Sequence, residues 1–195
     1  MSDLRLHRDV VTAFCENRLD PEEEADLALQ VARIYTCEPL LPNLTVALLG
    51  RMTKHLGGPG AVLDWLSGFP GEASLVAAVV RLNDLLGALS GSAPVLGAIQ
   101  KVRSRRGYRD PFRAYWAPTT DHVTLSDLAE GAKYRLRRAD QRGAYEISLQ
   151  VLDLLDEALT LVDADGHDVR SARGYVEEVR RHLESAIRSA ELAPR

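Results

Sequence analysis

Apolar residues between Ile147 and Val162 recur in alternating steps of three and four. One row comprises Ile147, Val151, Leu154, Ala158 and Leu161, and a second row comprises Leu152, Leu155, Leu159 and Val162. Because an α-helix has about 3.6 residues per turn, the two rows form one face that is too broad for a single neighbouring helix to cover. The pattern therefore predicts a core helix that other helices surround.

The same helical period recurs along the N-terminal half of the chain. It predicts about six short helices before residue 107, separated by proline, glycine and capping residues. Asp20, Pro21 and Glu23 predict a helix start with a capping box, Asn43 predicts the cap of a later helix, and Gly57 predicts its end. No segment alternates apolar and polar residues with a period of two, so we expect no substantial β-structure.

The apolar stripe resumes after residue 123 and continues into the core helix. Its members are Leu128, Ala132, Leu136, Ala139 and Gly143. The unbroken spacing predicts either one helix of about 40 residues, from Leu125 to Ala164, or a helix kinked at Gly143. Small residues in this stripe predict that a partner helix approaches closely.

A final helix follows a short turn, with Asp168 as its cap and an apolar stripe from Val169 to Ile187. Two striped helices joined by so short a turn are expected to pack antiparallel. The sequence thus predicts an all-α fold, in which an irregular bundle of about six short helices is followed by a long antiparallel helical hairpin.

The expected organisation has three parts. Residues 1–106 form an N-terminal helical lobe, residues 107–123 form an aromatic and basic connection, and residues 124–192 form the hairpin packed on the lobe. The connection holds four aromatic side chains, Tyr108, Phe112, Tyr115 and Trp116. They are expected either to anchor the connection on the core or to present an exposed aromatic surface.

Composition indicates an ordinary globular protein, with 46% hydrophobic and 27% charged residues. No apolar run reaches the roughly 18 residues that cross a bilayer, and the first residues lack the apolar core of a signal peptide. We therefore expect a cytoplasmic protein with no membrane partner. Cys15 and Cys37 lie inside expected helices without disulfide or metal spacing, which indicates two thiols in a reducing compartment.

Charge is distributed unevenly along the chain. Residues 101–142 contain 11 Lys and Arg against 5 Asp and Glu, whereas the remaining residues contain 13 against 23. On a helical projection, Tyr134 and Arg138 lie opposite the apolar stripe, and Arg135 and Arg142 flank it. We expect an anionic partner to bind a basic surface made of Lys101, Arg103, Arg105, Arg106, Arg109, Arg113, Tyr134, Arg135, Arg138 and Arg142.

Several kinds of partner fit such a surface. Guanidinium groups pair with phosphates and tyrosine rings stack on bases, which suits a nucleic acid. An acidic protein, or the acidic half of the same chain in a homo-oligomer, supplies carboxylates instead. The alternative is a solvated helix face in which Arg stems only cover hydrophobic edges.

Motifs for catalysis and cofactor binding do not occur in the sequence. There is no GxGxxG, GxxxxGK[ST], GxSxG or HExxH. Glu178 and His182 stand one helical turn apart, but without a second Glu/His element they indicate a surface ion pair. We predict no catalytic residue, no metal and no cofactor.

Three classes of function therefore stay open. The first, which we favour, is a non-enzymatic helical interaction protein or adaptor subunit with a basic surface for an acidic partner. The second is a nucleic-acid-binding accessory protein that uses residues 101–142. The third is an enzyme whose site is assembled from residues distant in sequence.

Overall fold

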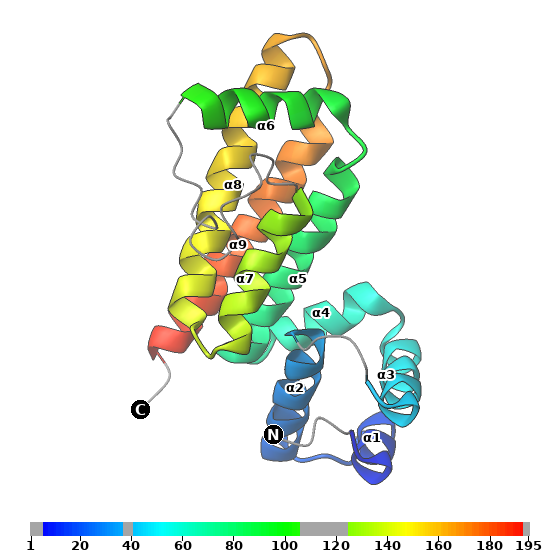
Figure 1. The fold of residues 1–195 in the computed structure, drawn as a ribbon. Helices are drawn as coiled ribbons and strands as arrows, with labels where there is room; N and C mark the ends of the chain where they lie inside the picture. The colour runs from blue at the N-terminus through cyan, green and yellow to red at the C-terminus, as the bar shows by residue number, and fades with distance from the viewer. Residues whose placement is uncertain (1–5, 37–40, 106–124, 193–195) are drawn as a thin grey trace. The chain divides into compact units, whose positions relative to one another are not determined.

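The computed structural model describes residues 6–36, 41–105 and 125–192, with side chains at all of these positions except 103–105, 125–129 and 189–192. These residues form helices and no strand, as the helical period predicted (Figure 1). The fold is all-α. The chain divides into two compact units, one of Met1–Ala78 with Ala186–Arg195 and one of Val79–Ser185. The connection expected at 107–123 lies outside the described residues.

The first unit begins with four helices, and the first turns of a fifth also belong to it. These are α1 (Arg8–Cys15), α2 (Pro21–Thr36), α3 (Asn43–Leu56), α4 (Pro59–Ser67) and the start of α5 (Glu72–Leu89). Helix α3 packs against both α1 and α4. Leu27, Val31, Met52 and Leu66 are fully buried in this unit.

The start of α2 has the expected capping box. Asp20 Oδ1 accepts hydrogen bonds from the backbone N–H of Glu22 at 2.9 Å and of Glu23 at 2.8 Å, and Glu23 Oε2 accepts one from the Asp20 N–H at 3.1 Å. The predicted end of α3 is also confirmed, because Gly57 adopts a left-handed conformation with φ of 100°.

The cap predicted for α3 was wrong. Helix α3 already includes Asn43, and Pro42 precedes it without a side-chain cap. Proline fixes an extended entry to the helix, so the chain turns into α3 one residue earlier than the asparagine signal suggested.

An aromatic cluster joins the helices of the first unit. The Phe14 ring contacts the rings of Trp65 and His55 edge-on, with centroids 5.1 and 5.7 Å apart, and Trp65 contacts Phe69 at 5.2 Å. Edge-to-face pairs of this kind stabilise aromatic clusters beyond the area that they bury. The cluster therefore ties α1, α3 and α4 together.

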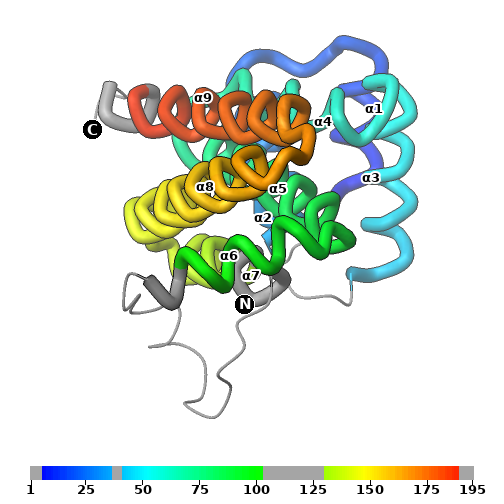
Figure 2. Tube along the Cα trace, turned by 90° about the horizontal axis from the view of Figure 1, so that it is seen from above, coloured from blue at the N-terminus to red at the C-terminus, as the bar shows by residue number. Residues whose placement is uncertain are grey.

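The second unit is built around α8 (Gln141–Ala164). Its other members are the remainder of α5, α6 (Ala93–Arg105), α7 (Leu125–Arg137) and most of α9 (Arg170–Leu192). Both α6 and α7 pack against α8 (Figure 2). The predicted core helix is confirmed, since Leu152, Leu155 and Leu159 are fully buried and Leu161 alone of the two rows is partly exposed.

Ion pairs connect α9 with α8. Arg173 Nη1 lies 2.9 Å from Asp163 Oδ2, and Arg180 Nη2 lies 2.7 Å from Asp156 Oδ2 and 3.0 Å from Asp153 Oδ1. Residue numbers rise along α9 while they fall along α8, which is the order of an antiparallel pair. Asp168 caps the start of α9, as expected, by accepting a 3.0 Å hydrogen bond from the Arg170 N–H.

The path of residues 125–164 differs from both expected forms. The helix ends at Arg137 and a new helix begins at Gln141, so the chain is neither continuous nor kinked at Gly143. Helix α7 folds back along α8 (Figure 1). Residues 125–192 thus form three helices, and the helix that packs on the small-residue stripe of α7 is α8.

Within the described residues, no single helix combines the length and apolar character needed to cross a membrane. Helix α5 together with Ala93–Val102 would meet that requirement, but the two segments are bent by 113°.

Candidate functional site

The turn between α7 and α8 gathers four of the residues predicted to bind an anionic partner. Arg138, Ala139 and Asp140 form this turn, in which the Arg138 and Asp140 N–H groups both donate to the Arg135 carbonyl oxygen at 3.0 Å. Ala139 adopts a left-handed conformation with φ of 56°. Residues with a Cβ rarely adopt this conformation, because Cβ crowds the following carbonyl oxygen.

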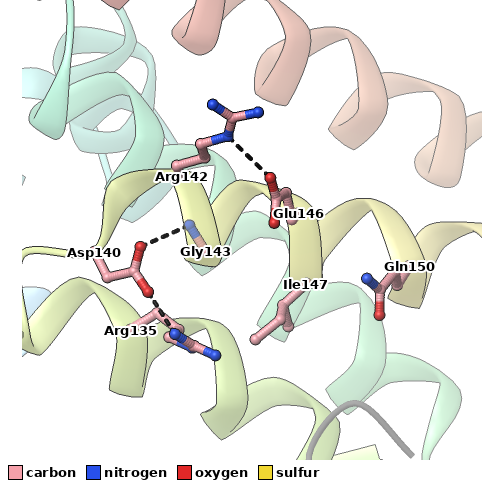
Figure 3. Close-up of a pocket in the computed structure, with 7 residues that line it drawn as sticks. All are labelled: Arg135, Asp140, Arg142, Gly143, Glu146, Ile147 and Gln150. Carbon is pink, nitrogen blue, oxygen red and sulfur yellow. Dashed lines mark hydrogen bonds and ion pairs between the residues drawn. The ribbon is translucent and has the colours of Figure 1, made fainter. Parts of the chain in front are cut away.

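Asp140 holds the turn through both carboxylate oxygens. Its Oδ1 accepts a 2.9 Å hydrogen bond from the Gly143 N–H, and its Oδ2 lies 2.5 Å from Arg135 Nη1 (Figure 3). The Gly143 N–H and then the Arg135 guanidinium lower the pKa of Asp140 below its usual value, since both favour the charged carboxylate. Asp140 therefore caps α8 and binds the last turn of α7 at once.

Gly143 is required by the position of this carboxylate. A Cβ at Gly143 would overlap the Oδ1, Oδ2 and Cγ atoms of Asp140. The glycine thus allows the close approach of Asp140 to the helix backbone, and it is not the site of a kink.

A surface depression of about 420 Å³ lies beside this turn. Its lining alternates in charge and has an apolar floor at Ile147, which is only 5% exposed. Figure 3 shows the lining side chains, which are Arg135, Asp140, Arg142, Gly143, Glu146, Ile147 and Gln150.

Two of the arginines at the turn extend toward solvent. Arg138 is exposed, and its guanidinium carbon lies 5.1 Å from the centroid of the Tyr134 ring. This is a cation–π contact between the turn and the last part of α7. The Arg142 side chain is 88% exposed, and its Nε lies 3.0 Å from Glu146 Oε1. Exposed pairs of this type contribute little to stability, about 0–1 kcal/mol, so a partner can replace them.

Carboxylates accompany most of the basic groups in this region. Lys133 Nζ lies 3.6 Å from Glu130 Oε1, and Arg137 Nη2 lies 3.4 Å from Glu130 Oε2. Together with Asp140 and Glu146, Glu130 makes the surface around the turn one of mixed sign. The described surface of α7 and the α7–α8 turn is therefore not uniformly positive.

The other predicted site residues do not join the turn within the described structure. Lys101 lies on α6, where its Nζ is 4.0 Å from Asp165 Oδ2, just past the far end of α8. A helix of the length of α8 spans about 36 Å, so Lys101 is remote from Asp140. Arg103 and Arg105 lie on α6 without described side chains, and Arg106, Arg109 and Arg113 lie outside the described residues.

Sequence reasoning missed the acidic and small residues of this site. Asp140, Gly143 and Glu146 shape the depression, and Asp140 directly precedes α8, where an N-cap is expected. That signal was present in the sequence, but the unbroken apolar spacing across it favoured a continuous helix. For the same reason Tyr145, which a continuous helix would place on the same face as Tyr134, lies on a different helix.

Two further features of the second unit lie away from the α7–α8 turn. A depression of about 250 Å³ lies among residues at the ends of α5, α6, α8 and α9, including Leu89, Val95 and His167. Glu178 Oε1 lies 3.9 Å from His182 Nε2, as expected for a pair one turn apart on α9. Among the described side chains, no three His, Cys, Asp or Glu residues are grouped as metal ligands would be.

Comparison of the chain with protein-family models, with curated proteins and with solved structures gave no match.

Proposed function

We propose that this chain is a non-enzymatic helical interaction protein, an adaptor or subunit, that binds an acidic protein partner at the α7–α8 turn. The observation that carries the proposal is the mixed charge of that turn. Arg138 and Arg142 extend from it, while Asp140 and Glu146 lie among them. A protein surface with carboxylates and some donors complements both signs, which gives specificity as well as attraction.

A phosphate backbone complements this surface less well. Nucleic acids bind through many Lys and Arg contacts to a uniformly negative chain, with release of counterions. Asp140, Glu146 and Glu130 place negative charge within the same region and would repel that backbone. The mixed surface thus favours a protein over a nucleic acid.

The proposal includes the finer architecture expected from the sequence, an N-terminal bundle of short helices followed by a long hairpin of α8 and α9. The Arg173–Asp163 and Arg180–Asp156 ion pairs support the antiparallel order of that hairpin. A cytoplasmic location is also part of the proposal. It is supported by Cys15, a free thiol on α1.

The structure changes the variant that tests this surface. Apolar spacing alone suggests reversal of Arg135, Arg138 and Arg142 together as a test that leaves folding intact, because none of the three lies in the apolar stripe. However, the Arg135 side chain is only 28% exposed and pairs with Asp140, so a glutamate there would place two carboxylates together at the cap of α8. Arg138→Glu with Arg142→Glu avoids this repulsion.

The experiment compares this double variant with Arg181→Glu plus Arg188→Glu, which changes the total charge equally at two exposed positions of α9, away from its cap at Asp168. A synthetic peptide of net negative charge, in which Glu residues are interspersed with Lys and Ser donors, and a single-stranded oligonucleotide of similar net charge serve as probes in calorimetric titrations at two salt concentrations. We expect wild type and the α9 variant to bind the peptide, and the turn variant to bind it at least about tenfold more weakly.

Two outcomes would contradict the proposal. Equal loss of peptide binding in both variants would show that only net charge matters. Preferential oligonucleotide binding, with log affinity falling about 0.7 per phosphate contact against log salt, would support a nucleic-acid partner instead. If neither outcome is seen, the partner is identified as the protein that is recovered from the native cells with wild type and is lost with the turn variant.

A further inference from the structure

The apolar spacing of α7 and α8 is continuous although the helices are not. The apolar positions recur in steps of three or four at Leu128, Ala132, Leu136, Ala139, Gly143 and Ile147. The chain nevertheless reverses direction at residues 138–140, between Leu136 and Gly143. If residues 138–140 became helical, these residues would form one stripe along a single long helix. The sequence is thus compatible with a folded-back and an extended form of the same segment.

Several residues of the turn favour a helical conformation and so disfavour the turn itself. Ala139 has a left-handed φ of 56° without being glycine, and alanine is the best helix former. Arg138 and Gln141, on either side of this part of the chain, are also good helix formers. Within the turn itself, the folded-back form is held by Asp140, through its bonds to Gly143 N–H and Arg135.

Opening of the turn would expose an apolar surface on each side of it. Ala132 and Leu136 are 1% and 7% exposed on α7, and Ala144 and Val151 are 0% and 1% exposed on α8. Because α7 packs against α8, an extended chain leaves the α7-binding face of α8 uncovered. The surface that fits this face by construction is α7 of a second copy.

We propose that two copies of this chain exchange α7, with residues 125–164 forming one continuous helix in each copy. The packing contacts between α7 and α8 are then re-formed between copies, while the strained turn and its Asp140 hydrogen bonds are lost. Such exchange of an identical element is a low-cost route to a dimer, and short hinge loops under strain favour it.

Chain length permits the exchange. Helix α7 is about 20 Å long, so its first residue moves by roughly twice that distance when the turn opens. The chain that joins α6 to α7 has 19 residues, 106–124, and can span at most about 65 Å. This inference does not depend on the proposed acidic partner.

Two single substitutions at the turn shift the equilibrium in opposite directions. Ala139→Gly relieves the left-handed strain and disfavours a continuous helix, so it favours the monomer. Gly143→Ala removes the space that the Asp140 carboxylate occupies and favours a continuous helix, so it favours the dimer. We expect each substitution to change the dimerisation constant by at least about tenfold, because both copies gain or lose the effect.

The experiment refolds wild type and both variants at high protein concentration and measures the dimer fraction by size-exclusion chromatography with light scattering. Spin labels at Lys133→Cys and Gln150→Cys, in a background with Cys15→Ser and Cys37→Ser, report the path of the chain by pulsed electron spin resonance. Labelled chains are refolded with excess unlabelled chains, so that only distances within one chain are measured.

In the dimer we expect the two backbone positions to be about 26 Å apart along one helix, and in the monomer to lie much closer, across two packed helices. The dimer fraction should rise in the order Ala139→Gly, wild type, Gly143→Ala. A dimer that keeps the short distance would overturn the proposal, and so would monomers of wild type and Gly143→Ala at every concentration. If Gly143→Ala does not fold, two measurements still test the exchange of α7. They are the dimer fraction of Ala139→Gly relative to wild type, which should be lower, and the distance within the wild-type dimer.

Discussion

Trp65 Nε1 donates a 2.8 Å hydrogen bond to Glu24 Oε1, which links α4 to α2 across 41 positions of the sequence. The same indole ring contacts Phe14 and Phe69 edge-on. One side chain thus combines an apolar contact with α1 and a polar contact with α2. Sequence spacing gives no indication of the link, because Glu24 lies in the acidic first turn of α2, where the helix dipole alone accounts for a carboxylate.

We predict that Trp65→Phe destabilises the first unit by about 1–2 kcal/mol, because the aromatic contacts are largely kept while the hydrogen bond to a charged acceptor is lost. Urea unfolding followed by circular dichroism measures the change. Glu24→Gln retains an acceptor and should cost less. Glu22→Gln removes the same charge from an exposed position of α2 and is the matched control for Glu24→Gln; an equal loss of stability in both would assign the effect of Glu24→Gln to the helix dipole.

We predict that Thr45→Val raises the free energy of unfolding of the protein. The Thr45 side chain is fully buried in the first turn of α3, and its Oγ1 has no hydrogen-bond partner among the described residues. Removal of an unsatisfied buried hydroxyl by an isosteric apolar group should stabilise the protein by about 1 kcal/mol. Thr53→Val is the control, since the Thr53 hydroxyl donates a 2.8 Å bond to the Leu49 carbonyl oxygen. A lower midpoint of thermal unfolding for Thr45→Val would contradict this.

Leu154→Asp should be among the most damaging single changes. Leu154 is 3% exposed on the central face of α8, and an aspartate there would be a buried charge without a basic residue one turn away. The cost is several kcal/mol, comparable with the stability of a small domain. Leu149→Asp, at a partly exposed position of the same helix, should be tolerated far better. Similar thermal melting of both variants would show that α8 is not central to folding.

Stability should depend on pH through Asp140. The Gly143 N–H and the Arg135 guanidinium lower the pKa of Asp140 from 3.8. A depressed folded-state pKa means that the carboxylate stabilises the fold above 3.8, and that this contribution is lost as pH falls through the lowered pKa. We predict that Asp140→Asn is less stable than wild type at neutral pH and that the difference shrinks in acid. Urea unfolding at a series of pH values measures it; a constant difference would rule out the ionised cap as its cause.

Local signals predicted the helices well because each depends on only a few neighbouring residues. The capping box at Asp20 and Glu23, the end of α3 at Gly57 and the buried rows of α8 are all of this kind. The all-α class follows from them. The boundaries 1–106, 107–123 and 124–192 stay a prediction.

The reversal at residues 138–140 could not be predicted from apolar spacing, because a three-residue turn does not disturb the steps of three and four. Only Asp140 marked it, and its carboxylate acts through Arg135 and Gly143 together. For the candidate site, spacing identified Arg138 and Arg142 but missed Asp140 and Glu146, which give the surface its mixed sign. The role of Asp140 follows only once α7 is folded back, whereas Glu146 pairs with Arg142 one turn away on α8, a spacing already present in the sequence.

The place of Trp65 in the aromatic cluster has an optical consequence. The chain has two tryptophans, and the other, Trp116, lies outside the described residues. In a Trp116→Phe protein all tryptophan emission would arise from the first unit, next to the rings of Phe14 and Phe69. Its intensity and wavelength would then follow that unit alone, whereas the helical signal follows both, so the cooperativity between the two units becomes directly measurable.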